Sequence, residues 1–439
     1  MSFLSVIKKF IILPTDKNID LQVRKHFRRN FITNTMDGAF WMFGESFVSV
    51  NTILPVFAST LTDSAIVIGM VPALIQAGWF LPQLFMAGYV NHLEKKLPFA
   101  KKMALVERAP YLILPLTAFL LPKLSENTAI WLFMIVVAWR GIASGMIALP
   151  WQELIAMVIP IPVRSRFFGV SRTIGRSMAV VGSVIAGIIL AYFAYPINYA
   201  ISFMVGAVFV WVSYFFFVRN IEPQVSNESV SKAPIYTRRM DLKSFKRILK
   251  KDKNFRYYLI SRSLFQLASM AIAFLAVYSI QTFRLADEQA AVFSGLLFTS
   301  AIAGFFVWGV FGDKVGPKKL LLFSDILQII LLGWILIAGN IWSIYGVFLV
   351  FGFSQSGNII GELVLAMELG KEDERPIYMG LARSIPGVFI LIAPLIGGTI
   401  VNLSGYPLMF ITSFLLTLIG FLVLLRVDQR PDLIVGNSQ

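Results

Sequence analysis

Long apolar stretches separated by short polar ones run through most of the chain. From Phe31 onward, twelve of them are long enough to cross a bilayer as an α-helix, which needs about 20 mostly apolar residues. They are expected at residues 31–58, 65–90, 102–123, 128–158, 167–194, 198–218, 256–283, 289–312, 319–339, 341–368, 377–402 and 406–426. The pattern predicts an all-α integral membrane protein with twelve transmembrane helices.

Composition agrees with this class and excludes several kinds of chemistry. Hydrophobic residues make up 57% of the 439 residues and charged ones 14%, which is too apolar for a soluble protein of this length. The absence of cysteine excludes disulfides, Cys-ligated metals and thiol catalysis. Both histidines lie outside the apolar stretches and the acidic residues are scattered, so we expect neither an enzyme nor a bound metal or cofactor. No Gly-rich nucleotide-binding loop is present, so direct use of ATP is not expected.

The positive charges predict the orientation in the membrane. Only Lys123 and Arg284 fall on one side of the spans, Arg108, Arg140 and Arg262 are counted within spans, and the other Lys and Arg residues are assigned to the opposite side. The positive-inside rule then places both termini in the cytoplasm, and we expect a bacterial cytoplasmic membrane. Because the basic residues are spread over many loop ends, the net charge of +15 does not indicate nucleic-acid binding.

The two halves of the chain resemble each other. Several residues of the first half recur at equivalent positions in the second half. The pairs are Asn30 and Asn254, Asp63 and Asp287, Gly88 and Gly312, Ala156 and Ala366, Met157 and Met367, Arg164 and Arg375, Gly169 and Gly380, Arg172 and Arg383, and Gly187 and Gly398. Each half holds an even number of spans, so the repeat is parallel. The predicted parts are an N-terminal segment (1–30), a six-helix bundle (31–218), a basic linker (219–253), a second six-helix bundle (254–426) and a tail (427–439).

Two polar segments of the chain are expected to contact membrane lipids. Residues 1–30 mix a short apolar run with basic residues, which predicts either an amphipathic anchor on the membrane surface or a solvated tail. In the linker, Leu242, Phe245, Ile248 and Leu249 recur at helical spacing with lysines between them. This predicts a surface helix that faces anionic lipid, with an unstructured basic linker as the alternative.

The stretch from Gly309 to Leu320 joins two predicted spans with glycines and charged residues. Gly309 and Gly312 are expected to let two helices approach closely, while Gly316 and Pro317 predict a tight turn. The spacing resembles the signature loop of the major facilitator superfamily, and the matching residues are Gly309, Asp313, Lys314, Gly316, Lys318 and Lys319. The first-half copy, residues 87–96, departs from it, with Asn91 in place of the acid and Glu94 in place of a glycine.

Two parallel six-helix halves are also the arrangement of that superfamily, so the resemblance extends in topology over residues 31–426. It implies a secondary transporter that exposes its site alternately to the two sides of the membrane, with the signature-loop residues acting in gating. It further implies a small-molecule substrate and protons or another coupling ion as partners. We expect a monomer.

Charged residues inside spans are candidate functional groups, since each costs about 2.5–3.5 kcal/mol at the bilayer centre. Glu45 lies eight residues after Asp37 in the first span, about 12 Å further along the helix, and is predicted to be a proton-coupling carboxylate. The alternative is a structural carboxylate held by an arginine. Arg140 is predicted either to bind an anionic group of the substrate or to pair with Glu45.

Other polar residues are assigned to gating or to the cavity. Asp37 and Arg262 are predicted to form an ion pair across the pseudo-twofold axis and to close the inner gate. Asn51, Gln76 and Gln266 are candidate hydrogen-bonding groups for the substrate, with helix packing as the alternative. The four acids Glu107, Glu153, Asp325 and Glu362 are expected to pair with Arg164, Arg172, Arg375 or Arg383 as gating elements.

Proton-coupled antiport leading to efflux is the favoured prediction, because acidic residues in the first span are similar to those of the superfamily's drug exporters. Proton-coupled uptake of an organic anion or sugar stays open. A lipid flippase and a non-transporting receptor on the same scaffold are alternatives of another class. The sequence does not identify the substrate.

Overall fold

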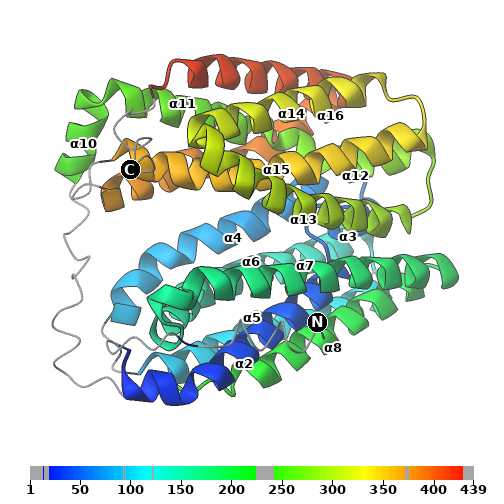
Figure 1. Ribbon diagram of the computed structural model, residues 1–439. Helices are drawn as coiled ribbons and strands as arrows, with labels where there is room; N and C mark the ends of the chain where they lie inside the picture. The colour runs from blue at the N-terminus through cyan, green and yellow to red at the C-terminus, as the bar shows by residue number, and fades with distance from the viewer. Residues whose placement is uncertain are drawn as a thin grey trace, which may run out of the picture. The chain divides into compact units, whose positions relative to one another are not determined.

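The computed structural model describes residues 13, 19–91, 93, 95–120, 123–223, 242–370 and 375–428, and this part of the chain is all helical (Figure 1). The helices are α2 (Leu21–Ser46), α3 (Ile53–Ser59), α4 (Ala65–Asn91), α5 (Lys96–Leu120), α6 (Glu126–Val158), α7 (Ile161–Tyr192), α8 (Ile197–Phe217), α10 (Leu242–Lys251), α11 (Lys253–Ala268), α12 (Met270–Phe283), α13 (Gln289–Val315), α14 (Pro317–Ile337), α15 (Ile341–Leu369) and α16 (Arg375–Leu425). Within these residues, nine helical stretches are long and apolar enough to cross a membrane, and Ala65–Phe80 is a shorter apolar helix.

The helices follow the predicted spans with four differences. The first span is divided into α2 and α3, and the seventh into α11 and α12. The last two predicted spans are merged in α16, which bends at Gly405, where φ is 79° and glycine is favoured. Helix α2 also begins ten residues before the expected start, because Asp20 Oδ1 accepts hydrogen bonds from the amides of Gln22 and Val23 and caps the polar first turns.

The breaks in the first and seventh spans lie at nearly equivalent places in the repeat. Helix α2 ends at Ser46, 16 residues after Asn30, and α11 ends at Ala268, 14 residues after the equivalent Asn254. At each break, carbonyl groups lose their intrahelical partners and become available to other groups. The break in the first span leaves Glu45 in the last turn of α2.

The contacts divide the chain into two compact units. The first comprises residues 1–62, 74–233 and 286–295, and the second comprises residues 63–73, 234–285 and 296–439. The division follows the two halves of the sequence repeat, except that the first residues of α4 and of α13 are each assigned to the other half's unit.

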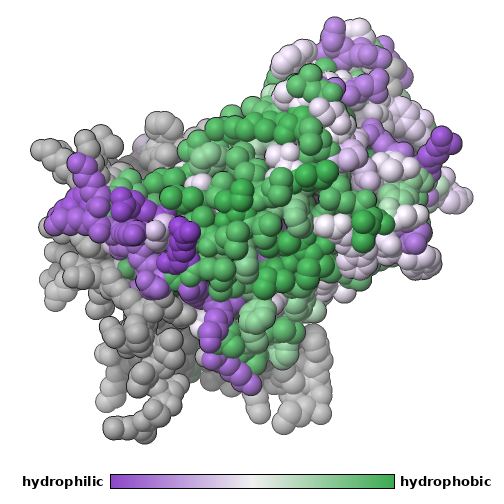
Figure 2. Space-filling model, turned by 90° about the horizontal axis from the view of Figure 1, so that it is seen from above, coloured by the Kyte–Doolittle hydropathy of each residue, from purple (hydrophilic) through white to green (hydrophobic). Residues whose placement is uncertain are grey.

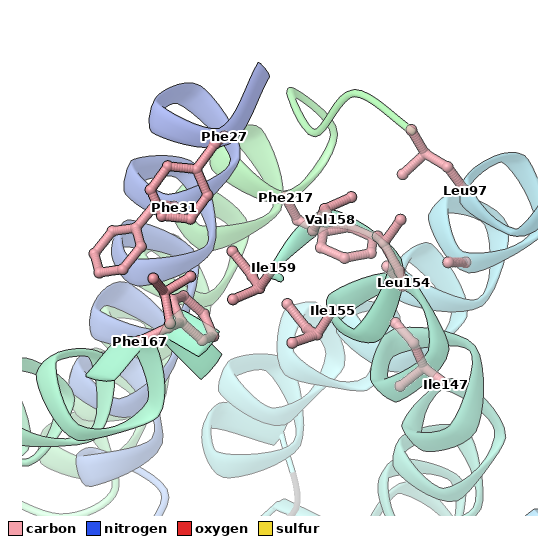
Figure 3. Packing of buried hydrophobic residues seen from close by; sticks show 13 residues of the cluster. Phe27, Phe31, Leu97, Ile147, Leu154, Ile155, Val158, Ile159, Phe167 and Phe217 are labelled. Carbon is pink, nitrogen blue, oxygen red and sulfur yellow. The ribbon is translucent and has the colours of Figure 1, made fainter. Parts of the chain in front are cut away.

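In the first unit, a cluster of buried apolar side chains joins α2, α5, α6, α7 and α8 (Figure 3). The ring of Phe31 meets those of Phe27 and Phe167 edge to face, with centroids 5.6 Å and 5.3 Å apart. Leu154 lies near the end of α6, and Ile159 is the residue that follows this helix. This packing fixes the start of α2 against the helix ends around it.

Helices α4 and α6 approach each other closely through glycines in the same unit. A Cβ atom on Gly141 would lie 2.6 Å from the carbonyl oxygen of Leu74 and 2.8 Å from Cα of Ile75. Gly78 and Gly145 meet the backbone of the facing helix in the same way. Small residues are what allow two membrane helices to come this near.

In the second unit, α10 packs beside the start of α11. Ile248 is 3% exposed and belongs to a buried cluster with Phe255 and Tyr258. Asp252 caps α11 by accepting from the amide of Phe255 at 2.8 Å, and Tyr378 Oη donates to the other carboxylate oxygen at 2.7 Å. The helix predicted in the linker is therefore present, while residues 224–241 lie outside the described part.

The turn between α13 and α14 bears out part of the prediction for the signature loop. Gly316 adopts φ 82°, and Pro317 is the first residue of α14. A Cβ atom on Gly312 would contact the side chain of Leu320, whereas one on Gly309 would meet no atom within 4 Å. The close approach expected at Gly309 is thus not found.

The outer surface of the helices is strongly apolar. Hydrophobic side chains gather over the middle of the face drawn in Figure 2, with hydrophilic ones toward its edges. Ile188 and Leu403, for example, are 62% and 80% exposed. Surfaces of this kind are expected where helices meet lipid.

Candidate functional site

Glu45 and Arg140 form a buried ion pair in the first unit. Arg140 Nη2 contacts Glu45 Oε2, and Tyr111 Oη donates a hydrogen bond to Glu45 Oε1. Arg140 Nε donates to the same Tyr111 oxygen at 2.9 Å, and Arg140 Nη1 donates to the Val48 carbonyl at 3.1 Å. The carboxylate, phenol and guanidinium therefore form a closed network contributed by α2, α5 and α6.

The break between α2 and α3 explains the position of this network. Val48 follows the end of α2, so its carbonyl is free to accept from Arg140. The last carbonyls of a helix also favour a nearby positive charge. The sequence predicted that Arg140 either binds an anionic group of the substrate or pairs with Glu45, and the structure contains the pair with Glu45.

The two partners differ in their access to solvent. The Glu45 side chain is 24% exposed, whereas that of Arg140 is 3% exposed. Arginine stays charged under all ordinary conditions, while a carboxyl group can bind and release a proton. The arrangement thus combines a fixed buried cation with a carboxyl group that a proton can reach.

A second arginine of the first unit, Arg108 on α5, is held by five acceptors. Its Nη2 donates to Asp37 Oδ1 at 3.1 Å and to Ser213 Oγ at 3.0 Å. Its Nη1 donates to Glu107 Oε2 at 3.1 Å and to the Ala104 carbonyl, and its Nε donates to a carbonyl of α8. All the hydrogen-bonding nitrogens of this buried cation are therefore satisfied.

Arg262 on α11 organises an equivalent cluster in the second unit. It forms an ion pair with Asp325 on α14 and reaches Glu362 Oε1 on α15 at 3.5 Å. Asn358 Oδ1 and Ser261 Oγ also accept from it, at 3.4 Å and 3.0 Å. Its Nε is buried and has no hydrogen-bond partner among the described residues.

These clusters correct several predicted ion pairs. The sequence predicted a pair between Asp37 and Arg262, whereas in the structure Asp37 pairs with Arg108 and Arg262 pairs with Asp325. Glu107, Asp325 and Glu362 use Arg108 or Arg262 rather than the arginines at the inner ends of the spans. The reason is that a buried arginine inside each unit lies nearer to these acids than any loop arginine does.

The remaining gating candidates have varied surroundings. Glu153 pairs with Lys96 at 2.8 Å, which corrects its expected arginine partner. Arg164, in the first turn of α7, donates to the carbonyls of Ala156 and Ile159 at the end of α6. Lys318 donates to a carbonyl at the end of α16, and Lys314 and Lys319 are exposed. The side chains of Asp313 and Arg375 lie outside the described part.

The three neutral cavity candidates, Asn51, Gln76 and Gln266, are half-buried. None of their side-chain amides appears in the hydrogen bonds of the described residues. Unused amide groups of this kind are available to a ligand, and their assignment to the substrate stays a prediction.

Sequence reasoning missed Tyr111 and Arg176, and it considered Arg172 only as a gating partner of the acids. Tyr111 joins Glu45 to Arg140, and nothing in its apolar surroundings in the chain marks it. Arg172 and Arg176 had been counted among the loop arginines, yet they lie within the stretch Arg166–Tyr192 that is apolar enough to span. The predicted limits of that span, 167–194, already contained both, so a stricter count would have found them.

Among the described residues, no group of three or more His, Cys, Asp or Glu side chains could hold a metal ion. The polar groups gathered in the interiors of the units are arginine–carboxylate clusters, which suit ion and solute binding rather than metal-dependent chemistry.

Comparison with known proteins finds similarity to membrane transporters. The family model described as Major Facilitator Superfamily matches residues 258–437. An uncharacterized MFS-type transporter of Methanocaldococcus jannaschii is 22% identical over 385 residues, covering 85% of this chain and 89% of the relative. A multi-drug resistance efflux pump PmrA homolog of Lactococcus lactis is 28% identical over 167 residues, covering 37% of this chain and 41% of the relative.

Solved structures show the same fold. A D-xylose-proton symporter matches with a TM-score of 0.67 at 13% identity, covering 94% of this chain and 99% of that one. A bacterial homologue of the iron transporter ferroportin in an inward-facing state matches with a TM-score of 0.65 at 14% identity, covering 94% and 100%. The chain is thus similar in sequence to proteins of the major facilitator superfamily and in fold to solved transporters, in agreement with the resemblance of the signature loop and the parallel repeat.

Proposed function

We propose that the protein is a proton-coupled secondary transporter that works by alternating access and exports a small solute. The observation that carries this proposal is the Glu45–Arg140 ion pair at the break of the first span. Ionisable groups inside membrane helices are costly and commonly serve ion or substrate pathways. Discontinuous helices near the bilayer midplane are common places for such sites in transporters.

The network suggests how a proton and a substrate are coupled. Protonation of Glu45 removes its negative charge and leaves Arg140 with Tyr111 and the Val48 carbonyl. Loss of one partner of a buried ion pair costs about 3–5 kcal/mol, so the remaining charge favours a new partner or a change of conformation. Coupling requires that proton and substrate each bind the inward and outward states with different affinity.

Two observations support the direction and the orientation. The relative from Lactococcus lactis carries the description of a multi-drug resistance efflux pump, which favours export. The side on which Lys and Arg residues concentrate favours cytoplasmic termini. In the alternative, uptake by proton symport, the Glu45 carboxyl group also binds the proton, but proton and solute cross the membrane in the same direction.

The test measures proton movement across liposomes that contain the purified full-length protein and a pH-sensitive dye inside. Organic cations, sugars and carboxylates are added one at a time to the outside. Wild type is compared with Glu45→Gln and with the matched control Glu126→Gln, which removes an exposed carboxylate at the start of α6. A neutral phospholipid bearing a fluorescent headgroup is tested in parallel as a flippase substrate.

We expect a solute-dependent proton flux that Glu45→Gln abolishes and Glu126→Gln retains. Proton movement opposite to the solute indicates antiport, and movement with it indicates symport. Equal fluxes in wild type and Glu45→Gln would overturn the role given to Glu45. Movement of the labelled lipid without any solute-dependent flux would replace the proposal by lipid transport.

A further inference from the structure

The ring of Tyr111 is held in a fixed place between α2 and α6. Tyr111 lies on α5 and is 1% exposed. The ring of Trp41 on α2 meets it edge to face, with centroids 5.6 Å apart. On the side of α6, Cζ of Arg140 lies over the tyrosine ring, 5.0 Å from its centroid. Contacts of these two kinds stabilise one orientation of the ring, so its hydroxyl group has a defined position.

The Tyr111 hydroxyl both donates and accepts in the network of Glu45 and Arg140. It donates its proton to Glu45 Oε1, and its oxygen accepts from Arg140 Nε at 2.9 Å. The other two nitrogens of Arg140 bind elsewhere, Nη2 to Glu45 Oε2 and Nη1 to the Val48 carbonyl at 3.1 Å. Tyr111 is therefore the neutral side chain that contacts the carboxylate and the guanidinium at the same time.

A proton that binds to Glu45 meets a donor at either oxygen. Tyr111 donates to Oε1 and Arg140 to Oε2. Arginine has no acceptor, so Arg140 cannot bind a carboxyl proton, whereas the phenol oxygen can accept one once its own proton has turned away. This oxygen has two lone pairs and can keep the bond from Arg140 Nε at the same time. Protonation of Glu45 on the side of Tyr111 thus requires the hydroxyl to reorient, while Arg140 stays in place.

The helices around Glu45 bring few other charged groups to it. Helices α3 and α8 contain no charged residue. On α5, Glu107 lies one turn before Tyr111 and near enough to feel the charge of Glu45, but it pairs with Arg108, as Asp37 on α2 does. The other charged or titratable groups of the packed spans are Arg172 and Arg176 on α7 and Tyr199 and Tyr214 on α8. Among the described residues, only α5 and α6 contribute direct partners of the Glu45 carboxylate.

We propose that Tyr111 is a positioning residue for proton coupling, because its hydroxyl holds Glu45 and Arg140 in one geometry and sets how readily Glu45 binds a proton. A hydrogen bond donated to a carboxylate favours the ionised form. This inference rests on the proposed function, since it gives Tyr111 a role in the proton step at Glu45. Phenylalanine at this position would keep the ring contacts with Trp41 and Arg140 and would remove only the hydroxyl.

The test follows the titration of Glu45 by infrared difference spectroscopy of the full-length protein in lipid. The signal is the carboxylic-acid band that Glu45→Gln removes, and its midpoint is the pH at which half of the band has appeared. Wild type is compared with Tyr111→Phe and with the matched control Tyr278→Phe. Tyr278 is half-buried on α12 in the second unit, where its ring packs against those of Tyr406 and Phe410.

We expect the midpoint of Tyr111→Phe to move to higher pH by about one unit, which is an about tenfold change in proton affinity. The reason is that the carboxylate loses a donor that favours its ionised form. Tyr278→Phe should titrate as wild type does. An unchanged or lower midpoint in Tyr111→Phe, or an equal shift in Tyr278→Phe, would overturn the proposal.

A second substitution decides the matter if Tyr111→Phe does not yield folded protein. Site-specific replacement of Tyr111 by meta-fluorotyrosine keeps the ring and the hydroxyl but makes the hydroxyl a stronger donor, so the midpoint should move to lower pH. A role in packing alone would leave the midpoint unchanged, and that result would overturn the proposal. If wild type shows no band that depends on Glu45, the proposed function is contradicted and the role of Tyr111 falls with it.

Discussion

Asp37 on α2 pairs with Arg108 on α5 at 3.1 Å, and the second half of the chain contains the same connection with the charges exchanged. There the arginine is Arg262 on α11 and the acid is Asp325 on α14. In the sequence repeat, α11 corresponds to α2 and α14 to α5. Each half therefore ties its first and third spans together by one buried ion pair of opposite polarity.

The first prediction concerns the stability of the first unit. Arg108→Met removes the cation that satisfies Asp37 and Glu107 and leaves both acids buried. We expect a loss of about 3–5 kcal/mol in the free energy of unfolding. Lys102→Met, an exposed position on the same helix, is the control and should change stability by less than about 0.5 kcal/mol. Thermal unfolding in detergent gives the comparison, and equal stabilities of the two variants would contradict a structural role for Arg108.

The second prediction separates the two acids that contact Arg262. Asp325 is 1% exposed and Glu362 is 29% exposed, and the Glu362 contact is the longer one at 3.5 Å. Asp325→Asn should therefore cost about 3–5 kcal/mol, and Glu362→Gln about 0–1 kcal/mol. Unfolding curves of the two variants provide the test. A larger effect of Glu362→Gln would show that Glu362 is the principal partner.

The third prediction tests the contact between α4 and α6. Gly141→Ala would place a methyl group against the backbone at Leu74 and Ile75, so the helices must separate. We expect a loss of about 1–3 kcal/mol. Gly387→Ala on α16 is the matched control, because its methyl group meets no atom within 4 Å, and it should stabilise its helix by up to about 1 kcal/mol. Two variants of equal stability would contradict the close approach.

The fourth prediction concerns pH and Asp287, which precedes α13 and lies outside the apolar spans. Burial, together with the neighbouring charge of Glu288, raises the pKa of Asp287, while the hydrogen bond that Tyr199 Oη donates to its Oδ2 at 3.0 Å acts in the opposite direction. A raised pKa in the folded state means that the fold favours the protonated form. Its contribution to stability is complete below the ordinary pKa of the unfolded group and is lost as the pH rises through the raised value.

Asp287→Asn imitates the protonated form and can still accept from Tyr199. We therefore expect the variant to lose less stability than wild type when the pH rises from acidic to neutral. The control is Asp63→Asn, at the equivalent position of the first half, which is exposed and should leave the wild-type pH dependence in place. Unfolding temperatures measured across this pH range decide the matter, and parallel curves for wild type and Asp287→Asn would contradict the prediction.

The helices could be predicted from the sequence because a bilayer imposes a minimum length of apolar chain. Breaks inside spans were not predictable in this way, since the predicted first span, residues 31–58, runs without interruption across the end of α2 at Ser46. The parallel repeat and the signature loop could also be recognised in the sequence, and they indicated the same family whose model matches residues 258–437. Gly316 was correctly assigned to a tight turn because its neighbour is proline.

The candidate site was only partly predictable. Glu45 and Arg140 stood out because charges are rare in apolar stretches, and their pairing was one of two stated alternatives. Asp37 and Arg108 are 71 residues apart, and no spacing rule relates the faces of two helices separated by a third. The repeat suggested a pair between Asp37 and Arg262, whereas each of these residues has an ion-pair partner within its own half.

The measurement that tests the central claim most directly is infrared difference spectroscopy of the protein in lipid, recorded from mildly acidic to mildly alkaline pH. It detects the carbonyl band of a protonated carboxyl group and needs no knowledge of the substrate. We predict a titrating carboxylic-acid band that is absent in Glu45→Gln and shifted in Arg140→Gln, with Glu126→Gln like wild type. Identical difference spectra for wild type and Glu45→Gln would show that Glu45 is not the proton-binding group.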